Sequence, residues 1–179
     1  MATMLVNIPC LDALLDRHAD PLGASFNAYR NHAYRVVNFH CLLGGEDIDL
    51  EKLSIAAAYH DLGIWSAGTF DYLAPSIAMA NAYLEDIGRT EWAGEISAMI
   101  DHHHKLTPCD PRERASVETF RRADWVDVSR GHLRFGLKRR VVASVMDMFP
   151  GFGFHRLLLK LSLKRMLTHP FSPLPMLRW

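Results

Sequence analysis

The chain has 179 residues, of which 49% are hydrophobic and 22% are charged, and its formal net charge is zero. This composition predicts a single folded domain over 1–179 and excludes a disordered chain, which would be poorer in apolar residues and richer in net charge. Three widely spaced cysteines favour neither a disulfide framework nor a zinc ribbon. Since no apolar run approaches the roughly 18 residues of a membrane span, we expect a cytoplasmic protein without an integral membrane segment.

Apolar residues recur at helical spacing along most of the chain, and the alternation typical of strands is nearly absent, so the expected fold class is all-α. Glycines at 44 and 45 are expected to close a long second helix, and Asp49 to cap the third. The predicted helices span 10–18, 25–43, 49–63, 75–87, 90–104, 110–131, 137–148 and 154–167. The last eleven residues contain three prolines and cannot form a regular helix.

Charge is distributed unevenly along the chain. Residues 1–127 hold 19 of the 20 acidic side chains but only 10 of the 20 basic ones, so the remainder carries ten basic residues against Asp147 alone. This pattern favours docking of the two parts on each other, and an anionic partner is the alternative. The basic helices of the extension over 131–179 are expected to cover the core. Contact with a membrane surface is an alternative, and no motif favours nucleic acid.

The most informative pattern is an adjacent His60-Asp61 pair in AAAYHDLGI, preceded by His32 in NHAYRV and followed by Asp124 in FRRADWVDV. Each part lies on its own predicted helix. This H…HD…D arrangement resembles the HD-domain superfamily of metal-dependent phosphohydrolases, over roughly residues 25–130. The resemblance implies an HD-domain-like helical bundle with a metal held by these four side chains.

The residue types themselves agree with a metal site. Imidazole nitrogens and carboxylate oxygens from three helices can fix a divalent ion and leave positions open for water and substrate. Two imidazoles and two carboxylates suit manganese, iron, cobalt, nickel or magnesium better than a closed structural zinc site. Because neighbours on a helix diverge by about 100°, His60 and Asp61 can reach one ion only near a helix end, which Gly63 permits.

Further polar residues are candidates for substrate contact. The resemblance favours His103, then His102, as a second metal or substrate contact, and it leaves His104 as a surface residue. Arg35 follows His32 by about one helical turn, and Arg121 and Arg122 precede Asp124, so these guanidinium groups could face an anion on the metal. Lys105 is a weaker candidate for the same role.

These features predict a hydrolase of a small phosphate ester, with a nucleotide as one candidate substrate. A metal-activated water would attack phosphorus, Asp61 would ligate the ion and accept a proton, and Arg35 and Arg122 would stabilise charge. Trp65 stands where some HD nucleotidases have a glutamate, and Ala74 where two-metal relatives have a histidine. The alternatives are a degraded HD domain that binds a nucleotide or partner without turnover, and an iron-dependent oxygenase. The sequence leaves a homo-oligomer open.

Overall fold

The computed structural model describes residues 3–44, 49–172 and 174–177, and within them the fold is all-α, without a β-strand. The first half contains α1 (Pro9–Asp16), α2 (Ala19–Leu22), η1 (Gly23–Ser25), α3 (Phe26–Gly44), α4 (Leu50–Tyr59), α5 (Gly63–Ser66) and α6 (Leu73–Asp86). The second half contains η2 (Thr90–Trp92), α7 (Ala93–His102), α8 (Ala115–Val128), α9 (Arg139–Met148) and α10 (Phe154–Thr168). The predicted fold class is therefore confirmed.

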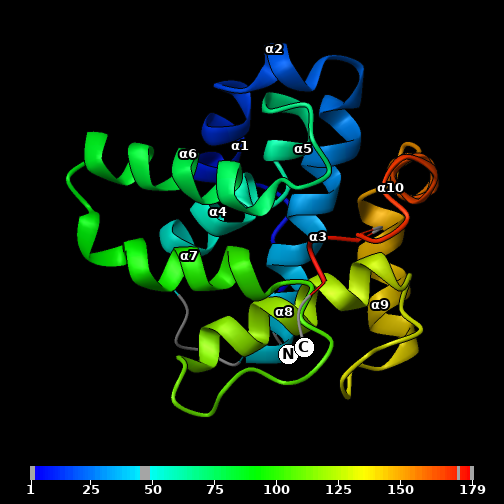
Figure 1. The fold of residues 1–179 in the computed structure, drawn as a ribbon. Helices are drawn as coiled ribbons and strands as arrows, with labels where there is room; N and C mark the ends of the chain where they lie inside the picture. Colours follow the sequence, from blue (N-terminus) through cyan, green and yellow to red (C-terminus); the bar gives the residue numbers. More distant parts are fainter. Residues whose placement is uncertain (1–2, 45–48, 173, 178–179) are drawn as a thin grey trace.

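Helix α3 is the central element of the bundle. It packs along α8 and also contacts α4 and α9, while α7 closes the side formed by α4 and α8 (Figure 1). Apart from the half-buried Arg30, residues 28–40 of α3 are all buried, and they include polar side chains. A buried polar group needs a partner inside the fold, so the side chains of α3 dictate much of what surrounds them.

Two asparagines of α3 illustrate how those partners are supplied. The Asn38 amide donates to the carbonyl of Leu5, and its Oδ1 accepts from the Leu5 amide at 2.8 Å. The Asn31 amide donates to the carbonyl of Pro150, also at 2.8 Å. These bonds attach the amino-terminal segment and the segment before α10 to the same central helix.

Several helix ends agree with the sequence and others differ. Asp49 caps α4 by accepting from the Lys52 amide, as expected, whereas the expected stop at Gly45 lies outside the described residues. Helix α7 ends at His102, short of the predicted 104. Helix α8 begins at Ala115 instead of 110, because the Asp110 carboxylate is used in a local turn, where it accepts from the Arg112 amide.

The carboxyl-terminal helices cover less of the core than expected. Helix α9 packs against α3 with Val142 and Val145 buried, but α10 buries only Phe154 among its described residues. Leu163 and Leu167 of α10 are exposed. In the described part of the chain, none of the helices combines the length and apolar character that crossing a membrane requires.

Gly63 allows the chain to turn closely against α6 directly after the His60-Asp61 pair. A Cβ atom at this position would lie 2.5 Å from the Tyr72 carbonyl oxygen and 3.0 Å from Ser76 Oγ, to which the Gly63 amide donates. Because backbone cannot move aside as a side-chain end can, we expect Gly63→Ala to lower the free energy of unfolding by about 2 kcal/mol. Urea denaturation measures this loss. Gly94→Ala, where a Cβ would meet nothing within 4 Å, is the control that should lose no stability.

Candidate metal centre

Four residues from three separate parts of the chain meet in the interior of the bundle. His32 Nε2 lies 2.8 Å from His60 Nε2, 3.5 Å from Asp61 Oδ2 and 3.5 Å from Asp124 Oδ1. His60 Nε2 lies 3.6 Å from the same Asp61 oxygen and 3.8 Å from the Asp124 oxygen. All four side chains are almost completely buried. The sequence thus identified the four side chains that the fold brings together.

The adjacent His60 and Asp61 both face this cluster because the helix ends there. Helix α4 stops at Tyr59, His60 is its C-cap, and Asp61 lies in the turn before α5. The Tyr29 hydroxyl, one turn before His32 in α3, donates to the Ala58 carbonyl and accepts from the Asp61 amide at 3.3 Å. Burial raises the pKa of Tyr29 well above its usual value, so the hydroxyl keeps its proton and this clamp is maintained.

The ring nitrogens of His32 and His60 are oriented by bonds on their far sides. His32 Nδ1 donates to the Asp127 carboxylate at 2.5 Å, and His60 Nδ1 donates to the Ala57 carbonyl at 2.9 Å. In a neutral imidazole, a proton on Nδ1 leaves a lone pair on Nε2. Two lone pairs would then face each other across 2.8 Å, so the arrangement requires a positive charge between them, either a proton or a metal ion.

The two aspartates of the cluster also require a positive charge nearby. None of the four carboxylate oxygens of Asp61 and Asp124 has a hydrogen-bond partner among the described residues, although all four are buried. Uncompensated buried carboxylates are strongly unfavourable. Burial alone would raise the pKa of Asp61, but the field of His60, followed by the contacts with His103 and His32, holds it well below its usual value. His104 is the main cause of the lowered pKa of Asp124. Both carboxylates are therefore ionised and available as ligands.

The two histidines also differ in their affinity for protons. Burial lowers the pKa of His60 to about 4, so this imidazole is neutral at neutral pH. Burial acts in the same direction on His32, but the contacts with Asp127 and Asp61 outweigh it and raise the pKa of His32 to about 9. Without another cation, His32 therefore supplies the positive charge. Buried imidazole and carboxylate donors that share one cation fit a divalent metal ion.

The histidine run after α7 adds two residues to the cluster. His103 Nε2 lies 3.3 Å from Asp61 Oδ1 and 3.4 Å from the Tyr72 hydroxyl, while its Nδ1 donates to the Ile100 carbonyl. His104 Nδ1 lies 3.2 Å from Asp124 Oδ2. Asp61 therefore belongs to two groups that could each hold an ion, the first with His32 and His60 and the second with His103 and His104.

This outcome confirms the proximity of His103 and corrects the expectations for its two neighbours. His104 is buried against Asp124 rather than lying on the surface. His102 is turned away, with its Nδ1 4.0 Å from Cys109 Sγ and its Nε2 3.6 Å from Asp101. Helix α7 ends at His102, His103 is its C-cap, and His103 and His104 both lie beside the aspartates of the cluster.

The basic residues expected to face a metal-bound anion are bonded to the protein instead. Arg35 donates to both oxygens of Asp127 and to the Phe149 carbonyl. Arg121 donates to Glu118 and to the Lys105 carbonyl, and the half-exposed Arg122 also donates to Glu118. The Lys105 ammonium donates to Thr107 and to the Pro108 carbonyl. All the described partners of these four basic side chains therefore lie outside the cluster of His32, His60, Asp61 and Asp124.

Three residues near the centre were not identified in the sequence, namely Tyr29, Tyr72 and Asp127. Asp127 follows Asp124 by three residues and so shares its helix face, a signal that was available. Tyr29 precedes His32 by the same interval. Tyr72 comes from the loop between α5 and α6, and its position depends on tertiary packing.

Comparison with known proteins adds no identification. No protein-family model matches the chain, and searches of curated proteins and of solved structures likewise found no match.

Proposed function

We propose that this protein is a metal-dependent hydrolase of small phosphate esters, built on an HD-domain-like bundle. The observation that carries the proposal is the convergence of His32, His60, Asp61 and Asp124 around a place where buried lone pairs and carboxylates need a cation. The order H…HD…D along the chain supports the same assignment, as does the origin of the ligands from three parts of an all-α fold.

A bound divalent ion would lower the pKa of a coordinated water and offset negative charge on a phosphoryl group. His32, His60, Asp61 and Asp124 would hold that ion, with His32 losing its proton on binding. Asp61 presents Oδ2 to His32 and His60 and Oδ1 to His103, so one carboxylate connects the two halves of the cluster. Asp61 and His103 are therefore the groups placed to take up a proton from water.

His104 marks the side from which substrate would approach. Its side chain is 10% exposed, whereas those of His32, His60, Asp61 and Asp124 are exposed by 1% or less. A small phosphate ester would therefore contact His104 first, with the fully buried His103 and the residues that hold the ion behind it. Manganese, iron, cobalt, nickel and magnesium all accept such donors.

The proposal is tested by phosphate release. Purified protein is analysed for bound metals and then assayed with manganese against p-nitrophenyl phosphate, its diester and a set of nucleotides. We expect turnover that requires the metal and falls by about a hundredfold or more in Asp61→Asn, because the variant loses both a ligand and a proton acceptor. The exposed Asp71→Asn variant should retain full activity. Metal-independent turnover, or equal activity in Asp61→Asn, would refute the proposal.

A domain that binds a nucleotide without turnover is the second candidate. It is favoured by the protein partners of Arg35, Arg121 and Arg122, which leave these guanidinium groups less available to a transition state. Metal-dependent binding of a nucleotide without phosphate release in the same assay would support this candidate over the hydrolase.

A further inference from the structure

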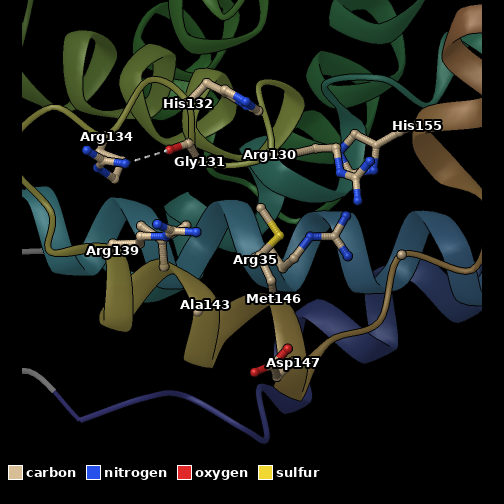
Figure 2. Close-up of a pocket in the computed structure, with 12 residues that line it drawn as sticks. Arg35, Arg130, Gly131, His132, Arg134, Arg139, Ala143, Met146, Asp147 and His155 are labelled. Atoms are coloured by element: carbon tan, nitrogen blue, oxygen red, sulfur yellow. Dashed lines mark hydrogen bonds between the residues drawn. The ribbon is translucent and has the colours of Figure 1, made fainter.

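A cavity outside the metal cluster lies between α3, the turn after α8, and α9. Its volume is about 730 Å³, within the range of small-molecule sites. Four arginines and two histidines line it: Arg35, Arg130, Arg134, Arg139, His132 and His155. Figure 2 shows Arg130 and Arg134 on one side of the space, with Arg35 and Arg139 facing them from the other. None of the cluster residues His32, His60, Asp61, His103, His104 and Asp124 contributes to this lining.

The cavity carries positive charge that the fold does not neutralise. Arg35 is paired with Asp127, but Arg130, Arg134 and Arg139 have no ion-pair partner among the described residues. Asp147 is the acidic residue of the lining, and it also takes part in no described ion pair. Helices α9 and α10 of the basic extension do contact α3, but these three arginines form no described ion pair with the acidic part, and their charge faces the cavity.

The backbone holds these arginines in place. At the end of α8 the Gly131 amide donates to the Val126 carbonyl at 2.8 Å, and Arg130 and Gly131 have positive φ angles of 53° and 75°. A Cβ on Gly131 would lie 2.7 Å from Val142 Cγ1, so only glycine lets this turn contact α9 so closely. Arg134 donates back to the Gly131 carbonyl, a bond drawn in Figure 2. The arginines thus project from a closed turn rather than from a free loop.

Helix α9 adds to the positive potential. The ten-residue helix begins at Arg139. The positive end of its dipole therefore lies beside Arg139, at the edge of the cavity. Further along α9, Val142, Ala143 and Met146 provide an apolar wall. The lining therefore combines a cationic end with an apolar face, which suits a ligand with an anionic group and an organic portion.

We propose that this cavity binds a small molecule bearing a diphosphate group. Two linked phosphates offer enough charge and acceptors for three unpaired guanidinium groups, which form charge-assisted and often bidentate bonds with phosphate oxygens. The cavity is partly open, but its basic residues gather around one hollow, which favours a small molecule over a nucleic-acid backbone that needs basic residues distributed along an extended face. The cluster residues do not line this cavity, so binding here does not need the metal, although Arg35 connects the two sites through Asp127, which also accepts from His32 Nδ1.

Binding of inorganic pyrophosphate to the full chain tests the proposal. Calorimetry in the presence of EDTA excludes a metal-bound ligand, and the Asp61→Asn variant excludes binding at the cluster. We expect one pyrophosphate per chain, bound about equally by the wild type and by Asp61→Asn. Arg139→Ala and Arg134→Ala should each weaken binding about tenfold or more, since each removes a hydrogen-bonding cation. Arg35 is left unchanged because it also supports Asp127.

Arg140→Ala is the matched control. Arg140 is the next residue of α9 and is also exposed, but it does not line the cavity. Its loss removes the same charge and should change binding about twofold at most through the general field. Equal weakening by Arg139→Ala and Arg140→Ala would indicate a diffuse basic surface of the kind nucleic acids bind, and would overturn the proposal. Absence of pyrophosphate binding to the wild-type chain would do the same.

Discussion

Manganese should raise the melting temperature of the wild-type protein and leave that of Asp124→Asn nearly unchanged. An ion that binds only the folded state at a hundred times its dissociation constant stabilises by about 2.7 kcal/mol. For a chain of this length that corresponds to a shift of about 5–10 °C. Asp124 Oδ1 lies 3.5 Å from His32 Nε2, so the substitution removes a charged donor from the centre of the cluster. Differential scanning fluorimetry with and without EDTA measures the shift.

The control for this experiment is the same substitution at an exposed aspartate. Asp71→Asn removes one negative charge from the loop before α6 but leaves every cluster residue in place. Its melting temperature should rise with manganese as the wild type does. Metal titration should show an affinity lower by about a hundredfold or more for Asp124→Asn, beyond the effect typical of outer-shell substitutions. If manganese raised the melting temperature of Asp124→Asn as much as that of the wild type, the ion would bind elsewhere. The proposed metal centre would then be refuted.

The sequence was sufficient to predict the helices that position the centre, because their signals are local. Apolar spacing and the Asp49 cap depend on residues within a few positions of each other. The His60-Asp61 pair could be placed near a helix end for a geometric reason, since adjacent helical side chains diverge, and α4 does end there. These predictions needed no knowledge of which helices touch.

The roles of the arginines could not be obtained in this way. Arg35 was expected to face an anion because it lies one turn after His32, but the same spacing equally brings it to Asp127 on α8. Whether Arg35 meets an anion or Asp127 depends on how α3 and α8 pack. The contact between Arg35 and Asp127 joins residues that are 92 positions apart in the sequence. Sequence spacing restricts a side chain to a face of its own helix, and tertiary packing decides what it meets.

The prediction for His102 and His104 was wrong for a different reason. A helix continued to residue 104 would direct three consecutive side chains about 100° apart, so one or two of them were expected to face the interior, with His103 and then His102 favoured and His104 left on the surface. The helix instead ends at His102, and the Lys105 amide donates to the His102 carbonyl in the turn that follows. Helix ends are the least certain part of a pattern-based prediction, and the contacts of His103 and His104 with the aspartates depend on how this helix end packs against α4 and α8.

Asp127→Asn should weaken metal binding by about ten- to a hundredfold although Asp127 does not face the ion. Its carboxylate accepts from His32 Nδ1 and from both Nε and an Nη of Arg35, all within 2.9 Å. An asparagine offers one acceptor oxygen and one donor amide. Its amide would therefore face either the N–H of His32 or an N–H of Arg35, and no hydrogen bond could form there. His32 would then lose the bond that fixes its tautomer and directs its Nε2 lone pair at the ion. Partners of this kind typically contribute such factors to metal affinity.

A comparison with Arg35→Met separates this effect from a general loss of stability. Removing Arg35 leaves the His32 and Asp127 contact in place but deletes a buried charge partner, so the free energy of unfolding should fall by about 3 kcal/mol or more in both variants. Metal affinity, measured on folded protein by chelator competition, should fall much further in Asp127→Asn than in Arg35→Met. If both variants lose affinity equally, the effect on the ion comes from loosening of α3 against α8, and Asp127 has no separate role in orienting His32.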